Sequence, residues 1–235
     1  MFSLKQLLEA LDTKPKQPIF PDSIPPHAPS LIYEGGELTT ATVLEAYTKG
    51  CFPWTGEAPI PWHSPNPRLI LPPAAFHASK NLLRLTRKQH YTIRFDQNFQ
   101  QVMGHCASIP REEKGTWITA NMKAVYGELF EKGVAHCVGV YREGRLVGGL
   151  YGLAIGCAFF GESMFSREPN TSKLALHALS QRLAAAGFLF IDCQQVTRHL
   201  LSLGAIPIRR CDYLKILKLA LSRQPQGPLW QAWNA

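Results

Sequence analysis

The stretch HCVGVYREGRLVGGLYGLAIGCAFFGESMF, residues 136–165, decides the fold. Much of it alternates with a period of two, and short glycine-marked breaks divide it into three segments. This period is typical of β-strands, whose successive side chains point to opposite faces of a sheet. Glu143 and Gly144 fit a tight turn between the first two segments. The stretch therefore predicts three strands joined as an antiparallel meander.

Glu162 stands in the third segment among residues that prefer burial, between Phe160 on one side and Met164 and Phe165 on the other. Burying a carboxylate costs roughly several kcal/mol unless the group is paired or hydrogen-bonded. Glu162 is therefore either a structural residue, which caps a loop or pairs with an arginine, or a chemical group in a functional site.

Asp192 and Gln194 lie in a second buried segment, FLFIDCQ at residues 188–194, after a predicted helix that ends at Gly187. In strand geometry both side chains point to the same face. If this strand lies beside the third strand of the meander, as the intervening helix allows, both residues converge with Glu162 at one end of the sheet. The structural alternative for Asp192 is a buried carboxylate that accepts backbone N–H bonds.

Further helices and strands are predicted around this centre from capping residues, helical spacing and glycine stops. Strands are expected at RLIL (68–71) and at 91–95, with a basic helix-like segment between them. Helices are expected to begin at Thr39 or Thr40 (ending at Gly50), Thr119 (ending at Gly133), Asn170 or Thr171, Thr197 and Asp212, with a short amphipathic helix at 4–11.

Two segments, residues 15–29 and 51–68, are rich in proline. Proline disfavours both helix interiors and central strands, so the first predicts an extended arm and the second a rigid aromatic loop. The order of elements predicts an α+β fold whose sheet is covered on both faces. We expect a small N-terminal domain with a Pro-rich arm at 1–68 and a larger domain at 69–235.

Composition and charge narrow the class of protein. The chain has 235 residues with a net charge of +8, which favours an anionic partner. Its six cysteines are scattered without a C-x-x-C pair or a histidine at metal-ligand spacing, so no metal is expected. The longest uncharged apolar run, residues 146–161, is interrupted by glycines and indicates sheet, not a membrane span. The N-terminus lacks the features of a secretory signal, which predicts a cytoplasmic protein.

Short blocks of the chain carry a resemblance to a known family. They are GCFPW (50–54), PWHSPNPR (61–68), REEKGTWIT (111–119), LVGGLYG (146–152), GESMFS (161–166), IDCQ (191–194) and HLLSLGA (199–205). In this order and spacing they resemble the leucyl/phenylalanyl-tRNA–protein transferase family. The resemblance implies that the larger domain has an acetyltransferase (GNAT)-like fold with a mixed, largely antiparallel sheet flanked by helices.

The reaction that the resemblance implies is aminoacyl transfer. The α-amine of a protein with N-terminal Arg or Lys attacks the ester carbonyl of leucyl-tRNA or phenylalanyl-tRNA, with methionyl-tRNA as a candidate third donor. The product is marked for N-end-rule degradation. No cofactor is needed, because the ester is already activated. The catalytic residues implied are Glu162, Asp192 and Gln194. Asp192 orients and polarises Gln194, whose carbonyl oxygen accepts a proton or a hydrogen bond from the amine. A neutral amide is a very weak base, so Gln194 is expected to orient the amine, and the proton leaves through water, Glu162 or the leaving ribose oxygen. Glu162 is expected to hold a cationic N-terminus.

Binding residues follow from the same resemblance. Leu150, Phe159 and Met164 are the implied walls of an aminoacyl pocket, and Trp54 and Trp117 stack on the terminal adenosine. The candidates for tRNA phosphates, which the basic charge also supports, are Lys80, Arg84, Arg87, Lys88, Arg94, Arg209, Arg210 and Lys215.

Three residues depart from the family's pattern. His63 stands where tryptophan is common, and Cys137 and Gly139 replace serine and glutamate, so acceptor binding is expected to differ if that glutamate positions the peptide amine. Two other functions are alternatives. A CoA-dependent N-acyltransferase is disfavoured because SREPNTSK (166–173) lacks a glycine-rich pyrophosphate loop. A non-catalytic RNA-binding module gives no reason for polar groups in two apolar strands.

Overall fold

The predicted meander is present in the computed structural model, which describes residues 20–88, 90–109 and 116–234. Its strands are β6 (Ala135–Arg142), β7 (Arg145–Ile155) and β8 (Ala158–Ser166), paired antiparallel in sequence order. The turn between β6 and β7 is at Glu143 and Gly144, where both residues have the positive φ that a tight hairpin requires.

The meander is the centre of a seven-stranded sheet with the order β10-β4-β9-β8-β7-β6-β5. The outer strands are β4 (Arg68–Leu71), β5 (Thr92–Phe95), β9 (Phe190–Gln194) and β10 (Ile206–Ile208). β9 lies beside β8, as the sequence allowed, and pairs with it in parallel, whereas the other described pairs are antiparallel. The sheet is therefore mixed and largely antiparallel.

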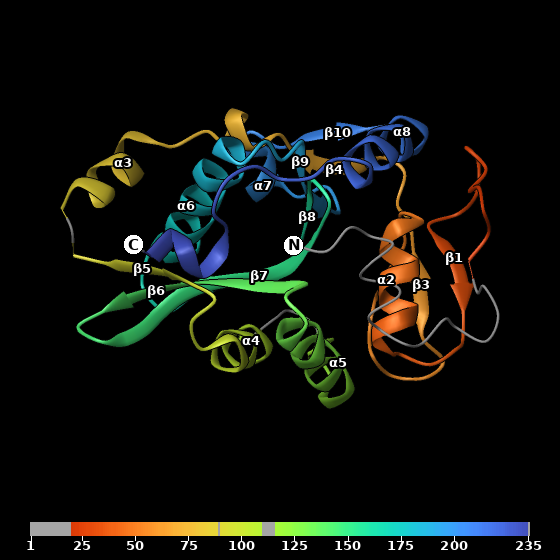
Figure 1. The fold of residues 1–235 in the computed structure, drawn as a ribbon, viewed down its shortest axis with the longest axis horizontal. Helices are drawn as coiled ribbons and strands as arrows, with labels where there is room; N and C mark the ends of the chain where they lie inside the picture. The colour runs from red at the N-terminus through yellow and green to blue at the C-terminus, as the bar shows by residue number, and fades with distance from the viewer. Residues whose placement is uncertain (1–19, 89, 110–115, 235) are drawn as a thin grey trace.

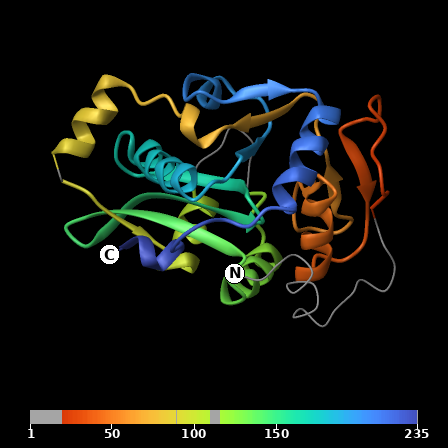
Figure 2. The ribbon, with the colours of Figure 1, turned by 45° about the horizontal axis from the view of Figure 1, so that its top comes forward.

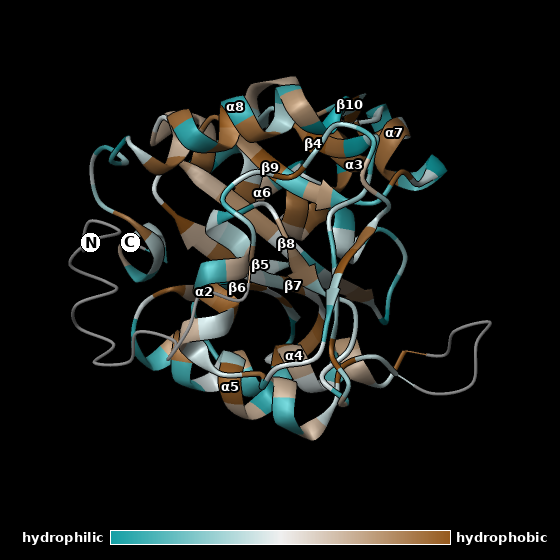
Figure 3. Ribbon diagram, turned by 90° about the vertical axis from the view of Figure 1, so that its right-hand side faces the viewer, coloured by the Kyte–Doolittle hydropathy of each residue, from teal (hydrophilic) through white to brown (hydrophobic). Residues whose placement is uncertain are grey.

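Helices cover both faces of this sheet (Figure 1). On one face lie α4 (Phe99–Ala107) and α5 (Ala120–Glu131), and on the other α6 (Thr171–Ala185). Each face has its own apolar core, and apolar residues continue through the central strands in Figure 3. The other helices described after residue 68 are α3 (Lys80–Arg87), α7 (Arg198–Ser202), α8 (Arg210–Leu221) and the 3₁₀ segments η1 (Pro73–Ala75) and η2 (Trp230–Asn234). The α+β class predicted from the order of elements is confirmed.

Most predicted helix starts are confirmed by their caps. The side chains of Thr39, Thr119 and Thr197 each accept a backbone N–H bond at the start of a helix. The prediction that Asp212 caps the last helix is wrong, because α8 begins at Arg210 and Asp212 lies in its first turn. There its carboxylate pairs with Arg209 and is favoured by the helix dipole. The helix predicted at residues 4–11 lies outside the described residues.

The N-terminal part contains α2 (Thr40–Thr48) and a small sheet of β1 (Leu31–Glu34), β3 (Pro61–His63) and β2 (Phe52–Pro53), in that order. The prediction that residues 51–68 contain no central strand is wrong, because β3 is paired on both sides. The strand tolerates this because it has only three residues and its proline is the first. α2 packs beside α5 and α8 at the end of the central strands, where the ring of Tyr47 contacts that of Phe160 on β8 (Figure 2).

Candidate active site

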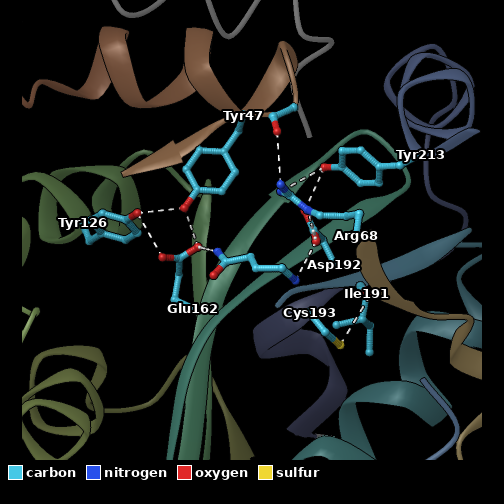
Figure 4. Close-up of polar contacts among 10 residues, drawn as sticks. Tyr47, Arg68, Tyr126, Glu162, Ile191, Asp192, Cys193 and Tyr213 are labelled. Carbon is cyan, nitrogen blue, oxygen red and sulfur yellow. Dashed lines mark hydrogen bonds and ion pairs between the residues drawn. The ribbon is translucent and has the colours of Figure 1, made fainter. Parts of the chain in front are cut away.

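Glu162 is the centre of a hydrogen-bonded cluster built from both parts of the chain (Figure 4). Its side chain, on β8, accepts a hydrogen bond from Tyr47 on α2 at 2.5 Å and from Tyr126 on α5 at 3.1 Å. The two tyrosine hydroxyls are 3.0 Å apart, and the side-chain amide of Gln194 donates to Glu162 at 3.2 Å. The structure therefore brings together Glu162 and Gln194, as the sequence predicted, and adds two tyrosines.

Burial raises the pKa of Glu162 to about 7, although hydrogen bonds from Tyr47 and Tyr126 oppose the rise. Its residue exposure is 9%, whereas both tyrosines are fully buried. Burial also raises the pKa of each tyrosine, and the nearby carboxylate adds to that effect. Glu162 is therefore a carboxyl group whose charge changes close to neutral pH.

Asp192 forms a buried ion pair with Arg68, and both side chains are fully buried. Arg68 donates through Nε and Nη2 at 2.8 and 2.6 Å, and Tyr213 on α8 donates to the same carboxylate at 2.8 Å. The guanidinium lies between the rings of Phe52 and Tyr213 and also donates to the carbonyl of Gly50. Asp192 is thus held as a fixed, paired charge between the N-terminal segment and the sheet.

The contact between Asp192 and Gln194 differs from the expected one. Asp192 accepts the backbone N–H of Gln194 at 2.9 Å, while the side-chain amide of Gln194 reaches Glu162. Gln194 has a φ of 62°, so strand alternation ends at this residue. Asp192 therefore holds the backbone of Gln194, and the carboxylate that contacts the side-chain amide of Gln194 is Glu162.

An apolar cavity of about 120 Å³ opens beside Glu162 and Gln194. Leu150, Phe159 and Met164, which the resemblance implies as walls of an aminoacyl pocket, line this cavity. Sequence reasoning missed other apolar lining residues, which are Leu176 on α6, Ile191 on β9 and Leu200 on α7. These residues come from separate helices and strands, so no local pattern marks them.

Trp54 and Trp117 do not line this cavity. Trp54 has 43% of its surface exposed, lies in a stacked arrangement with Phe52 and has the ring of His63 at 4.7 Å. The departure at His63 therefore lies directly beside a predicted adenosine-stacking residue. Trp117 is partly buried and packs against the apolar core under α5.

The predicted phosphate-binding residues lie in two separate places. Lys80, Arg84, Arg87 and Lys88 are exposed on or directly after α3, and Arg94 is on the neighbouring strand β5. Arg209 directly precedes α8 and Lys215 lies on it, away from α3 in Figures 1 and 2, and both pair with Asp212.

Arg210 does not belong to a phosphate-binding surface. It is 1% exposed, and its guanidinium donates to the carbonyl oxygens of Pro25, Ala28 and Pro29. These bonds fix the segment before β1 to α8. The sequence did not reveal this role because the acceptors are backbone atoms more than 180 residues away.

Cys137 and Gly139, the two residues of β6 that depart from the family's pattern, lie inside the sheet. Cys137 is buried, and its thiol contacts the carbonyl of Gln97 at 3.5 Å. A Cβ atom on Gly139 would lie 2.7 Å from the ring of Tyr141. A larger residue at 139 therefore requires Tyr141 to move.

Tyr47, Tyr126, Arg68 and Tyr213 were missed as site residues by sequence reasoning. The only available signal was that buried tyrosine hydroxyls need hydrogen-bond partners. Tyr47 and Tyr126 lie on buried faces of α2 and α5, but Tyr47 is 115 residues from Glu162, so their meeting depends on the tertiary fold. Among the described residues, no group of three or more His, Cys, Asp or Glu is placed to hold a metal ion. No helix in the described ranges has the length and apolar character needed to cross a membrane.

Comparisons with known proteins agree on one family. Residues 70–218 match the family model described as leucyl/phenylalanyl-tRNA protein transferase, and residues 36–66 match the model of that family's N-terminal domain. A leucyl/phenylalanyl-tRNA–protein transferase of Pseudomonas entomophila (strain L48) is 48% identical over 206 residues, covering 87% of this chain and 91% of that protein. Another, of Thiobacillus denitrificans (strain ATCC 25259 / T1), is 50% identical over 185 residues, covering 78% and 81%.

Solved structures that match include a GCN5-related N-acetyltransferase from Kribbella flavida, at 13% identity and a TM-score of 0.39, with 69% of this chain and 58% of that chain covered. The structure of L-PGS from Bacillus licheniformis matches at 14% identity and a TM-score of 0.37, with 54% and 44% covered.

Proposed function

The chain belongs to the leucyl/phenylalanyl-tRNA protein transferase family, and from this premise we propose that it forms a peptide bond at the site around Glu162. The enzyme transfers leucine or phenylalanine from aminoacyl-tRNA to the α-amine of an acceptor protein. The single observation that carries the assignment to this site is a buried carboxyl group and a side-chain amide at the wall of an apolar cavity.

The cavity holds the side chain of the transferred amino acid. Its volume is about 120 Å³, and its walls include Leu150, Phe159 and Met164. An apolar cavity of about 150 Å³ accommodates benzene in another protein, so this somewhat smaller space suits a leucine side chain, and the larger phenylalanine ring requires the lining side chains to move apart. Burial of the apolar side chain stabilises the complex by about 25 cal/mol per Å² removed from water.

Glu162 and Gln194 receive the acceptor's amine. An ammonium group placed beside Glu162 favours the ionised carboxylate, because opposite charges stabilise each other in a desolvated site. The amide nitrogen of Gln194 is already bonded to Glu162, so its carbonyl oxygen is the group left to accept a hydrogen bond from the amine. Asp192 fixes the backbone of Gln194 through the 2.9 Å bond and itself stays paired with Arg68.

The nucleic acid binds outside the cavity. Trp54 presents an exposed indole for stacking on the terminal adenosine, and Trp117 is the second proposed stacking residue. The exposed basic residues of α3 bind phosphates of the tRNA body, together with Arg94. The preferred acceptors have N-terminal Arg or Lys, and the products enter N-end-rule degradation in the cytoplasm, where charged tRNA is found.

The test is a transfer assay with two donors and one acceptor. Leucyl-tRNA and acetyl-CoA are each incubated with a peptide that begins with Arg, and with the same peptide blocked at its α-amine. We expect leucine on the free α-amine only, identified by mass spectrometry. Acetylation of the peptide without leucine transfer would replace the proposal with the CoA-dependent alternative, and tRNA binding without either product would favour an RNA-binding module.

A further inference from the structure

We propose, on the basis of the transfer reaction above, that Glu162 carries the proton from the attacking amine to the leaving ribose oxygen. Tyr47 and Tyr126 are the positioning residues for this transfer, because they provide partners for the buried carboxyl in both of its protonation states. This adds to the expected role of Glu162 as a partner for a cationic amine.

The cluster of Glu162, Tyr47 and Tyr126 has more oxygen-to-oxygen contacts than the two hydroxyls have protons. Three oxygen-to-oxygen contacts connect Glu162, Tyr47 and Tyr126 in a ring, at 2.5, 3.0 and 3.1 Å. Each contact needs one proton to be a hydrogen bond. The two hydroxyls supply two protons, so the third comes from a protonated Glu162. The ring therefore fits the carboxylic acid.

The same residues also fit the carboxylate. When Glu162 is ionised, Tyr47 donates to one carboxylate oxygen and Tyr126 to the other, and the amide of Gln194 adds a third donor. Of the three contacts in the ring, only the one between the two hydroxyls is then without a hydrogen between its oxygens. Rotation of hydroxyl hydrogens is enough to pass between the two arrangements, so no large movement of the buried side chains is required.

The proton transfer balances without any further reagent. The acceptor's ammonium first loses one proton to solvent, the resulting neutral amine attacks the ester carbonyl, the N–C bond forms, and a second proton moves from nitrogen to the Glu162 carboxylate. The C–O bond then breaks, and the ribose oxygen takes that proton from Glu162, which returns to its ionised form. The amine's usual pKa of about 7.7 to 8.0 is close to that of the buried carboxyl, which favours transfer in both directions.

Neither of the other polar groups at the cavity suits this task. Asp192 already accepts two bonds from Arg68, one from Tyr213 and one from the backbone of Gln194. Gln194 carries a neutral amide, which is a very weak base. Glu162 alone among these three combines a place at the cavity wall with a charge that changes near neutral pH. The titratable and charged groups around it are Tyr47 on α2, Arg68 on β4, Tyr126 on α5, Tyr151 on β7 and Asp192 on β9.

The experiment compares Tyr126→Phe and Tyr47→Phe with the wild type in single-turnover transfer from pH 5.5 to 9, at saturating leucyl-tRNA. The hydroxyls donate to the carboxylate and so lower its pKa, and their loss raises it. We expect the fall in rate on the acid side to move to higher pH in both variants, with a maximal rate lower by about tenfold or more. The matched control is Tyr91→Phe, which removes a 2.8 Å bond to Glu168, a half-buried carboxylate outside the cavity. It should leave the profile unchanged.

An identical pH profile in Tyr126→Phe and the wild type, with normal folding and tRNA binding, overturns the proposal. A lower rate without a pH shift also overturns it, because that is the result of a purely structural role. If Tyr47→Phe does not fold, Tyr126→Phe alone decides. Failure of the wild type to transfer leucine at any pH would refute the proposed function instead, so the two failures are distinguishable.

Discussion

Replacing Arg68 with methionine should destabilise the protein strongly. Arg68 and Asp192 are both fully buried, and the guanidinium makes two short bonds to the carboxylate. The variant leaves the Asp192 charge with only the hydroxyl of Tyr213 and the N–H of Gln194. Removing one partner of a buried ion pair costs about 3–5 kcal/mol, and that range is the expected loss in the free energy of unfolding.

The measurement is urea denaturation followed by tryptophan fluorescence and circular dichroism. A second variant, Arg68→Met with Asp192→Leu, removes both charges and should recover most of the loss, because apolar replacement of a buried ion pair is often neutral. The control is Arg145→Met, whose pairing with Glu143 is exposed and should contribute no measurable stability. A loss below about 1 kcal/mol in Arg68→Met, or a double variant no more stable than the single one, would refute this reasoning.

Three further predictions concern the donor. Trp54→Ala and Trp117→Ala should each weaken aminoacyl-adenosine binding by about 1–3 kcal/mol in a calorimetric titration, and aggregation or a collapsed melting temperature would indicate a packing role. Neutralising Arg84 and Arg87 together should reduce both the affinity for whole charged tRNA and its salt dependence while sparing aminoacyl-adenosine, whereas equal effects on the two donors would exclude a tRNA-body site on α3. His63→Trp should tighten aminoacyl-adenosine binding, because it enlarges the aromatic surface beside Trp54, and unchanged or weaker binding would argue against stacking there.

The parts of the fold that depend on local pattern were predictable from the sequence. The period-two meander and the threonine caps gave β6 to β8 and the starts of α2, α5 and α7. The placement of β9 beside β8 was also predictable, because a helix between two strands allows them to lie side by side. The place of β3 between two partners was not, because pairing is a non-local property and the proline content argued against it.

The candidate site was predictable only where its residues break a local pattern. Glu162 and Asp192 are polar residues in apolar strands, so the sequence marks them. Tyr47 and Tyr126 look like ordinary residues of buried helix faces, and nothing local shows that their hydroxyls meet. Arg210 resembles a surface charge next to Arg209 in the sequence, but distant backbone carbonyls draw it inside. The chemistry of these side chains depends on contacts that only the tertiary structure supplies.

The most direct test of the central claim separates chemistry from nucleic-acid binding at Glu162. Wild type and Glu162→Gln are saturated with leucyl-tRNA, mixed rapidly with an Arg-ended peptide, and quenched to measure the rate of leucyl-peptide formation. The dissociation constant for uncharged tRNA is measured in parallel. The proposed site predicts a rate lower by about 10²-fold or more with tRNA affinity unchanged within about twofold. A wild-type rate in Glu162→Gln, or a loss explained entirely by weaker tRNA binding, would contradict it.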